Sequence, residues 1–197
     1  MIIPDVKLKH FDGEVYQRNK LLVALKYVPD GVVIDCGAHV GTWTKQFAYL
    51  AKKVIAIEPN PINFAYLESN LKGINNIELI NAVVWDKSEE TVKITTDSLS
   101  ICQHVSDRGL DVKTICLDDI NEQPLFIKLD VEGCEYKALI GAERLIKTYR
   151  PILYIELKDR CQRKYGSSKE RVMALLTEWE YVVVDKIMHD YIYVSKI

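Results

Sequence analysis

The sequence predicts an α/β fold in which a mostly parallel sheet carries helices on both faces and includes one antiparallel strand. Short β-branched apolar runs alternate with longer segments of helical periodicity, which is typical of parallel strands joined by helices. A glycine-rich turn follows the first of these runs, as in doubly wound sheets. The last two runs are joined only by KIMHD, which is too short for a crossover helix, so they must form a hairpin that reverses one strand.

Length and composition predict one domain. With 197 residues, 48% of them apolar, the chain is long enough for a sizeable core. We expect residues 1–30 to form an N-terminal helical segment and residues 31–197 a Rossmann-like core. A net charge of −2 gives no electrostatic case for a nucleic-acid partner or an anionic membrane. Because Pro4 and Asp5 interrupt the apolar start and no run could span a bilayer, we expect a soluble, cytoplasmic protein.

The first predicted helix, residues 12–28, leads into the strand VVIDC and the turn DCGAHVG. This turn differs from G-x-G-x-x-G by the carboxylate of Asp35, which would repel a phosphate. Asp35 suits cationic or hydroxyl groups, such as the amino acid and ribose portions of S-adenosylmethionine. Gly37 and Gly41 would let the backbone approach that ligand, and a helix over residues 42–51 would present its first amides. Alternatively, the turn only packs a helix on the sheet.

The second and third strands add candidates for ligand binding. Residues 53–58 form a strand that ends at Glu58, about twenty residues past the turn, where such folds hold the two ribose hydroxyls. A helix over residues 62–71 leads to a strand over residues 77–85, whose end would lie beside the first two strand ends. Candidates there for the edge and face of an adenine are Asn81, Ala82 and Val83, although Ala82 and Val83 would also suit a strand core.

Residues 125–136, LFIKLDVEGCEY, form a second group of charged residues. Strand alternation places Lys128, Asp130 and Glu132 on one face near the end of a strand, and Glu135 falls in the first turn of the next helix. Isolated charges are costly to bury, so these groups meet either a ligand or one another. An ion pair between Lys128 and a carboxylate is the alternative to a functional site.

The remaining elements complete the sheet. Residues 91–117 contain TVKITT, LSICQHV and DVKTICL, which we expect to be short extra strands. A helix that ends at Tyr149 precedes the strand ILYIEL, which brings Glu156 to the same rim as Asp130. Residues 158–171 are basic and could form a lid that attracts an anionic acceptor, and a last helix over residues 169–179 leads into the hairpin. The cations of this segment are Lys158, Arg160, Arg163, Lys164, Lys169 and Arg171.

A short-chain dehydrogenase that uses NAD(P) is an alternative, because YGSSK, from Tyr165 to Lys169, matches the Tyr-x-x-x-Lys of that family. Four observations count against it. The turn lacks T-G-x-x-x-G-x-G, no serine lies about a dozen residues before Tyr165, the chain is short, and its last two strands form a hairpin.

The motifs VVIDCGAHVGTWT, VIAIEPNP, TICLDDI and IKLDVEGCEYKALIGAERLIKTYRPILYIEL together resemble the FkbM family of S-adenosylmethionine-dependent methyltransferases, from about Val32 to Leu157. The resemblance implies a class I methyltransferase sheet and O-methylation of a hydroxyl, often on a sugar or a polyketide-like natural product. By position, it implies cofactor contacts from Asp35, Gly37, Ala38, Gly41, Glu58, Asn81, Ala82 and Asp130. We add His39, Thr42 and Pro59 from the same motifs and Val83 from the third strand, although the family commonly has Asn where this chain has His39.

Methyl transfer is an in-line displacement on a sulfonium, so most of the catalysis is to hold the acceptor oxygen in line with the methyl group. A hydroxyl nucleophile also benefits from a base, and our candidates are Asp130, Glu132 and Glu156. These carboxylates could also hold Mg²⁺, but we predict activity without a metal. A third hypothesis is a module that binds the cofactor and has lost catalysis.

Overall fold

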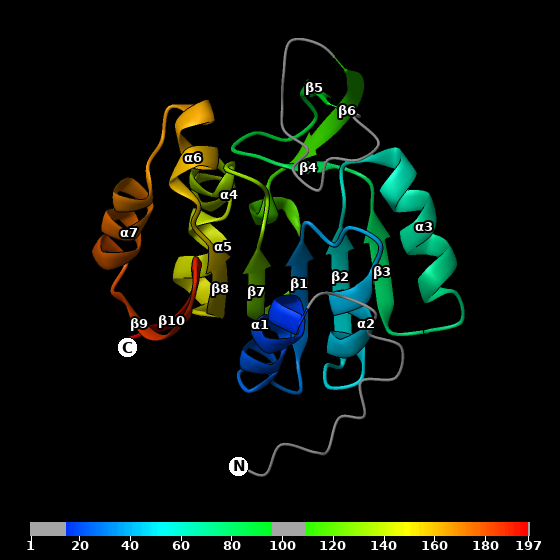
Figure 1. Cartoon of the computed structure of the whole chain (residues 1–197), viewed down its shortest axis with the longest axis horizontal. Coiled ribbons are helices and arrows are strands. Elements are labelled where there is room, and N and C mark those ends of the chain that lie inside the picture. The colour runs from blue at the N-terminus through cyan, green and yellow to red at the C-terminus, as the bar shows by residue number, and fades with distance from the viewer. Residues whose placement is uncertain (1–14, 96–108, 197) are drawn as a thin grey trace.

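The computed structural model describes residues 15–95 and 109–196, and its centre is a seven-stranded sheet of order β3-β2-β1-β7-β8-β10-β9 (Figure 1). The strands of this sheet are β1 (Val32–Cys36), β2 (Lys53–Ile57), β3 (Ile77–Ile80), β7 (Pro124–Leu129), β8 (Ile152–Glu156), β9 (Tyr181–Ile187) and β10 (Asp190–Ser195). A second sheet of order β4-β6-β5 contains β4 (Val83–Val84), β5 (Thr91–Ile94) and β6 (Leu110–Ile115).

The α-helices cover both faces of the large sheet, as predicted. They are α1 (Val15–Leu25), α2 (Thr42–Ala48), α3 (Pro61–Leu71), α4 (Glu135–Ile140), α5 (Glu143–Tyr149), α6 (Asp159–Gln162) and α7 (Lys169–Glu178), with short 3-10 helices η1 (Leu117–Asp119) and η2 (Arg163–Tyr165). Leu21 of α1 and Phe47 of α2 pack with Val33 and Phe126 on one face. On the other face, residues of α4, α5 and α7 pack against Ile34 and its neighbours. The apolar runs therefore form strands because both of their faces are buried.

The pairing confirms a mostly parallel sheet with a C-terminal hairpin. β1 lies between β2 and β7 and runs parallel to both, and β8 runs parallel to β7. β10 runs antiparallel to β8 and to β9, so the reversed strand lies one place inside the edge. The carboxyl ends of β1, β2, β7 and β8 therefore lie along one rim.

The prediction of one strand over residues 77–85 is wrong. β3 ends at Ile80, and β4 pairs in parallel with β6 in the second sheet. Between them, Nδ2 of Asn81 donates to the carbonyls of Glu58 at 2.7 Å and Pro59 at 3.1 Å, so a side chain takes the place of strand pairing. The antiparallel pair β5–β6 confirms two of the expected extra strands, and LSICQHV, residues 99–105, lies outside the described residues.

Two other segments differ from expectation. The helix expected to end at Tyr149 is divided into α4 and α5 at Gly141, where a Cβ would lie 2.0 Å from the carbonyl oxygen of Trp85. The expected lid, residues 158–171, forms α6, η2 and the start of α7, and Gln162 within it is fully buried. Tertiary packing decides both the division of the helix at Gly141 and the folding of residues 158–171. The local sequence pattern shows neither.

α1 (Val15–Leu25) ends three residues before the predicted end at residue 28, and residues 12–14 of the predicted helix lie outside the described residues. Within the described part of the chain, each helix is too short or too polar to cross a membrane. The organisation of residues 1–197 as one domain stays a prediction.

Candidate active site

A pocket with about 720 Å³ of empty space, part of it open to solvent, lies at the rim where β1, β2 and β7 end. The residues predicted for the site that line it are Gly37, His39, Glu58, Pro59, Ala82, Val83, Asp130 and Glu132. Cys134 also lines the pocket, and the lining residues that sequence reasoning did not select are Ile57, Asn63, Val84, Ile94 and Val131. The remaining candidates are not among the residues that line this pocket; they are Asp35, Ala38, Gly41, Thr42, Asn81 and Glu156.

The turn after β1 is held against the end of β7. Gly37 has a φ of +80°, and a Cβ there would lie 2.0 Å from the carbonyl oxygen of Asp130. The amides of Gly37 and Ala38 both donate to the carbonyl of Ile57, at 2.9 and 3.0 Å. Glycine is therefore needed here because the backbones of two neighbouring strand ends meet.

Gly41 and Thr42 start α2, where Gly41 packs against α3 and Thr42 is exposed. The φ of Gly41 is +89°, and a Cβ there would lie 2.8 Å from Cδ1 of Leu67 in α3. Gly41 therefore allows α2 and α3 to pack closely. A direct contact of Gly41 or Thr42 with a ligand stays a prediction.

Asp35 is fully buried, and both of its oxygens have protein partners. Oδ2 accepts a hydrogen bond from Oγ1 of Thr44 at 2.7 Å, and Oδ1 lies 3.0 Å from Nζ of Lys128. Burial opposes ionisation of Lys128, but Asp35 and Asp130 outweigh it and raise the pKa of the ammonium group. Lys128 therefore forms an ion pair with a carboxylate, which the sequence analysis gave as the alternative to a functional site. Asp35 acts on the pocket through this lysine.

Glu58 follows β2 and is the buried carboxylate on the opposite side of the pocket. Its Oε2 accepts from the amide of His39 at 2.8 Å, and its Oε1 accepts from the amide of Asn60 at 3.0 Å and Nδ2 of Asn63 at 3.4 Å. Burial raises the pKa of Glu58, against the effect of these donors. A carboxylate has about four acceptor positions, so Glu58 retains capacity for a further donor such as a hydroxyl.

Beside Glu58, Ala82 and Val83 line the pocket, and each is 5% exposed. Asn81 fixes this segment through its bonds to the carbonyls of Glu58 and Pro59. A small apolar surface next to a carboxylate is suited to a purine ring attached to a ribose.

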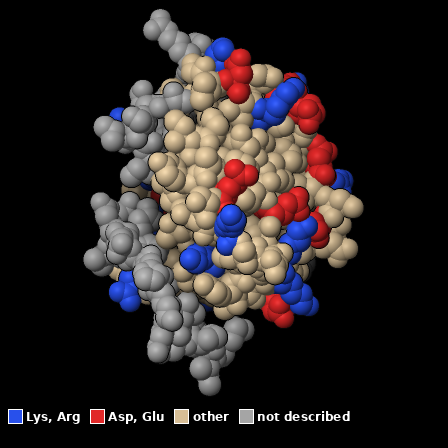
Figure 2. All heavy atoms as spheres, turned by 90° about the vertical axis from the view of Figure 1, so that its right-hand side faces the viewer, with Lys and Arg blue, Asp and Glu red and all other residues tan. Residues whose placement is uncertain are grey.

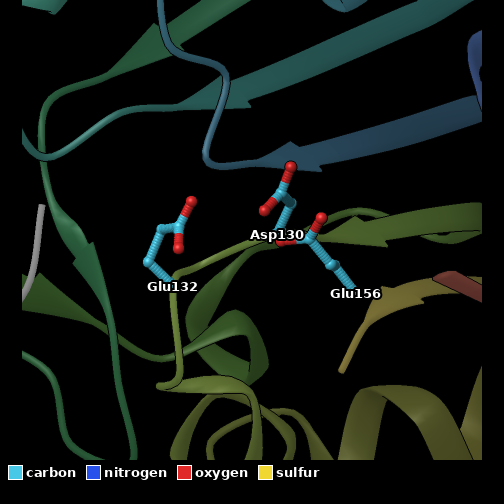
Figure 3. A group of neighbouring side chains, drawn as sticks. All are labelled: Asp130, Glu132 and Glu156. Carbon is cyan, nitrogen blue, oxygen red and sulfur yellow. The ribbon is translucent and has the colours of Figure 1, made fainter. Parts of the chain in front are cut away.

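Three carboxylates gather at the other end of the pocket: oxygens of Asp130, Glu132 and Glu156 lie within 4.8 Å of one another. Figure 3 shows Asp130 between the other two side chains. The Asp130 side chain is 31% exposed, whereas that of Glu156 is 6% exposed. Asp130 and Glu156 thus lie at the same rim of the sheet, as predicted. Their catalytic roles stay predictions.

The surroundings of these carboxylates separate their proton affinities. Burial raises the pKa of Asp130 well above its usual value; Lys128 opposes this, and the negative charges of Glu156 and Glu132 add to it. Burial also opposes ionisation of Glu156, but Lys158 and Lys20 outweigh it and hold its pKa below the usual value. Such a separation is how two neighbouring carboxylates take different roles in acid–base chemistry.

Lysines neutralise this cluster. Nζ of Lys158 lies 2.5 Å from Glu156 and 3.9 Å from Glu132, and Nζ of Lys20 lies 2.9 Å from Glu156. These ammonium groups supply the positive charge that a bound cation would provide, so we assign no metal to the cluster. Activity without a metal stays a prediction. Sequence reasoning did not select Lys20, although a lysine on the apolar face of a predicted helix was a signal for it.

Glu135 stabilises the turn below the pocket. Its Oε1 accepts from the amides of Val131 and Gly133, both at 3.1 Å, and its Oε2 accepts from Nε2 of Gln162. Burial raises the pKa of Glu135 to about 7, although these donors favour the anion. Glu135 therefore orders the loop that carries Glu132.

The YGSSK segment lies apart from the pocket lining. The ring of Tyr165 packs edge-on against Trp85 with 6.3 Å between ring centroids, and Ser167 is 7% exposed. The segment thus contributes packing next to the site.

Comparisons with known proteins agree with this geometry. The family model described as the methyltransferase FkbM domain matches residues 35–183. Over 72 residues, the chain is 32% identical to a probable ribosomal RNA small subunit methyltransferase A of Methanosarcina acetivorans, a match that covers 36% of this chain. The chain spans only 25% to 27% of the length of the relatives of that name from three Methanosarcina species.

Solved structures share the fold. A methyltransferase FkbM from Methylobacillus flagellatus superposes with a TM-score of 0.54 and 21% identity, over 82% of this chain and 42% of that chain. The N-methyltransferase NodS from Bradyrhizobium japonicum, solved in complex with S-adenosyl-L-homocysteine, superposes with a TM-score of 0.59 and 13% identity, over 93% of this chain and 87% of that chain. These structures confirm the predicted fold class.

Proposed function

Because this chain belongs to the FkbM methyltransferase family and S-adenosylmethionine is its methyl donor, we propose that it methylates a hydroxyl of a small polyhydroxylated acceptor such as a sugar. The observation that carries this proposal is the position of Asp130 and the raised pKa of its carboxyl group. Its carboxylate lines the pocket, and its pKa is raised, first by burial and then by Glu156 and Glu132. The family match decides against the dehydrogenase alternative.

The chemistry of the residues that line the pocket suits S-adenosylmethionine, which would supply an electrophilic methyl group when bound. Glu58 offers acceptor capacity for ribose hydroxyls, and Ala82 and Val83 offer an apolar surface for the adenine. Asp130 and Glu132 place negative charge at the far end of the pocket, which suits a cationic sulfonium and amine. Contacts from His39, which lines the pocket, and from Asp35, Ala38 and Thr42, which lie outside its lining, stay proposals.

We assign the removal of the acceptor proton to Asp130. A base is most effective when its pKa lies near the operating pH, and the raised pKa of Asp130 brings it toward that range. Glu156 has two lysine partners and a lowered pKa, so it is a poor proton acceptor. We therefore propose that Glu156 remains an anion beside Asp130 and does not itself take the proton.

The charges of the site favour a neutral acceptor over an anionic one. Lys158 is the cation of the basic segment that reaches the carboxylate cluster, and it is already paired with Glu156 and Glu132. An anion placed there would face three carboxylates within 4.8 Å of one another. A hydroxyl group, which can donate to a carboxylate, meets no such repulsion.

The experiment is an acceptor screen with purified protein and S-adenosylmethionine, in which mass spectrometry quantifies S-adenosylhomocysteine. The panel contains neutral sugars, uronic acids, amino sugars and a ribosomal RNA transcript. The proposal predicts product with a neutral hydroxylated acceptor and a loss of about 10² to 10⁴ in rate for Asp130→Asn. Methylation confined to amines would overturn O-methylation, and methylation confined to RNA would overturn the small polyhydroxylated acceptor. Cofactor binding with no methylation of the panel would favour the inactive module.

RNA is the second candidate acceptor, because the Methanosarcina relatives are named as probable ribosomal RNA methyltransferases. Two features of this chain weigh against it. The net charge is −2, and basic and acidic side chains are interspersed on the face that Figure 2 shows. The absence of a nucleic-acid partner and the cytoplasmic location stay predictions.

A further inference from the structure

Lys20 is a buried lysine of α1, before the segment that the family model matches. The residue is 4% exposed, and its Nζ lies 2.9 Å from Oε1 of Glu156 and 2.7 Å from Oδ2 of Asp190. Glu156 and Asp190 lie directly opposite each other on β8 and β10. Two carboxylates in such a cross-strand pair repel, so the ammonium group between them is what allows both to be buried.

The other partners of the two carboxylates are also defined. Oδ1 of Asp190 accepts from the hydroxyl of Tyr154 at 2.7 Å. Oε2 of Glu156 lies 2.5 Å from Nζ of Lys158. Glu156 therefore has an ammonium group at each oxygen, one from α1 and one from the segment after β8. The remaining charged groups around it are Asp130, Glu132 and, behind Asp130, Lys128 with Asp35.

We propose that Lys20 is a positioning residue that holds Glu156 as an anion beside Asp130, so that Asp130 and not Glu156 takes the proton of the acceptor. The assignment of the proton to Asp130 rests on the proposed function. The assignment of Lys20 rests on the two ion pairs and on the position of Glu156 in the carboxylate cluster. A neutral residue in place of Lys20 would let Glu156 compete for the proton, because an opposite charge within about 4–6 Å favours the ionised form.

The test follows the ionisation of Glu156 directly in the full chain, without an acceptor. Protein labelled with [5-¹³C]glutamate is titrated from pH 8 to about 4.5 by NMR, and Glu156→Gln assigns the resonance. We expect Glu156 to stay ionised over this range in the native protein. In Lys20→Met its apparent pKa rises by at least about one pH unit. Lys20→Arg keeps the charge and the native titration.

The matched control is Lys26→Met, because Lys26 is exposed just after the end of α1. It should leave the titration of Glu156 unchanged. If Lys20→Met does not fold, Lys20→Gln carries the same test, since it keeps hydrogen-bond donors and removes the charge. Glu156 titrating alike in the native protein and in the neutral variant would overturn the proposal. So would an equal shift in Lys26→Met.

Binding of S-adenosylhomocysteine, measured by calorimetry, separates positioning from general support of the fold. Neither Lys20 nor Glu156 lines the pocket, so the dissociation constant of Lys20→Met should stay within about twofold of the native value. Weaker binding with an unchanged Glu156 titration would mean that Lys20 only supports the fold, and would overturn the proposal. Failure of the acceptor screen would affect the proposed function and leave this titration decisive for Lys20.

Discussion

Lys128 and Asp35 form an ion pair inside the sheet, with 3.0 Å between Nζ and Oδ1 and side chains that are 3% and 0% exposed. They lie directly opposite each other on β7 and β1. Nζ of Lys128 also lies 3.8 Å from Asp130, so this pair connects the turn after β1 to the proposed base. The two charged residues of K-x-D therefore have different roles: Lys128 pairs with Asp35 inside the sheet, and Asp130 lies at its rim.

Lys128→Met should destabilise the protein by about 3–5 kcal/mol, because it leaves the charge of Asp35 buried without compensation. Urea denaturation measures this loss. The double variant Asp35→Asn with Lys128→Met should lose less than the sum of the two single variants, since it removes both charges. Lys72→Met, at an exposed position after α3, should stay within about 0.5 kcal/mol of the native protein. A loss below about 1 kcal/mol for Lys128→Met would contradict the buried pair.

Gly37→Ala should destabilise the protein more than Gly73→Ala. Both glycines have left-handed backbones, with φ of +80° and +86°. A Cβ at Gly73 meets nothing within 4 Å, so only the conformational cost of about 1–2 kcal/mol applies. A Cβ at Gly37 would lie 2.0 Å from a backbone oxygen of Asp130. Thermal unfolding compares the two, and equal losses would show that the β1 turn and β7 are not in close contact.

Glu58→Gln should weaken S-adenosylhomocysteine binding by about 10- to 100-fold, because hydrogen bonds to a charged acceptor contribute about 1.5–3 kcal/mol. Calorimetric titration measures the dissociation constant. Glu68→Gln, at an exposed position of α3, is the matched control and should bind like the native protein. Unchanged affinity in Glu58→Gln would remove the ribose role from this carboxylate.

Glu135 should make stability fall as the pH rises. Burial raises the pKa of Glu135 to about 7 from 4.5, so the folded state binds its proton more tightly than the unfolded state does. This contribution is fully present below about pH 4.5 and is lost as the pH rises through about 7, by on the order of 1–3 kcal/mol. Glu135→Gln should remove this part of the pH dependence in urea denaturation at pH 5 and pH 8.

The Gln side chain suits this position. In Glu135→Gln, the amide oxygen of the new side chain can accept from the amides of Val131 and Gly133, as Glu135 does. The new amide nitrogen can donate to Oε1 of Gln162, which has no hydrogen-bond partner among the described residues. A pH dependence that persists unchanged in Glu135→Gln would have to arise from other groups.

The sequence by itself determined the α/β fold, the family motifs and the rim that carries Glu58, Asp130 and Glu156. These features follow from local patterns: the burial of both strand faces requires apolar runs, and parallel strands place their carboxyl ends at one edge. The hairpin was also local information, since a five-residue connection excludes a crossover helix.

Only the tertiary structure decided which charges meet and where helices and strands break. Lys20 reaches Glu156 across 136 positions of sequence, and Lys128 reaches the strand that carries Asp35 across 93. The breaks at Asn81 and Gly141 arise from contacts with distant backbone atoms of Glu58 and Trp85. Hydrogen bonds, ion pairs and close packing depend on three-dimensional distance, so spacing along the chain identifies the candidate carboxylates and Lys128 but neither Lys20 nor which carboxylate each lysine meets.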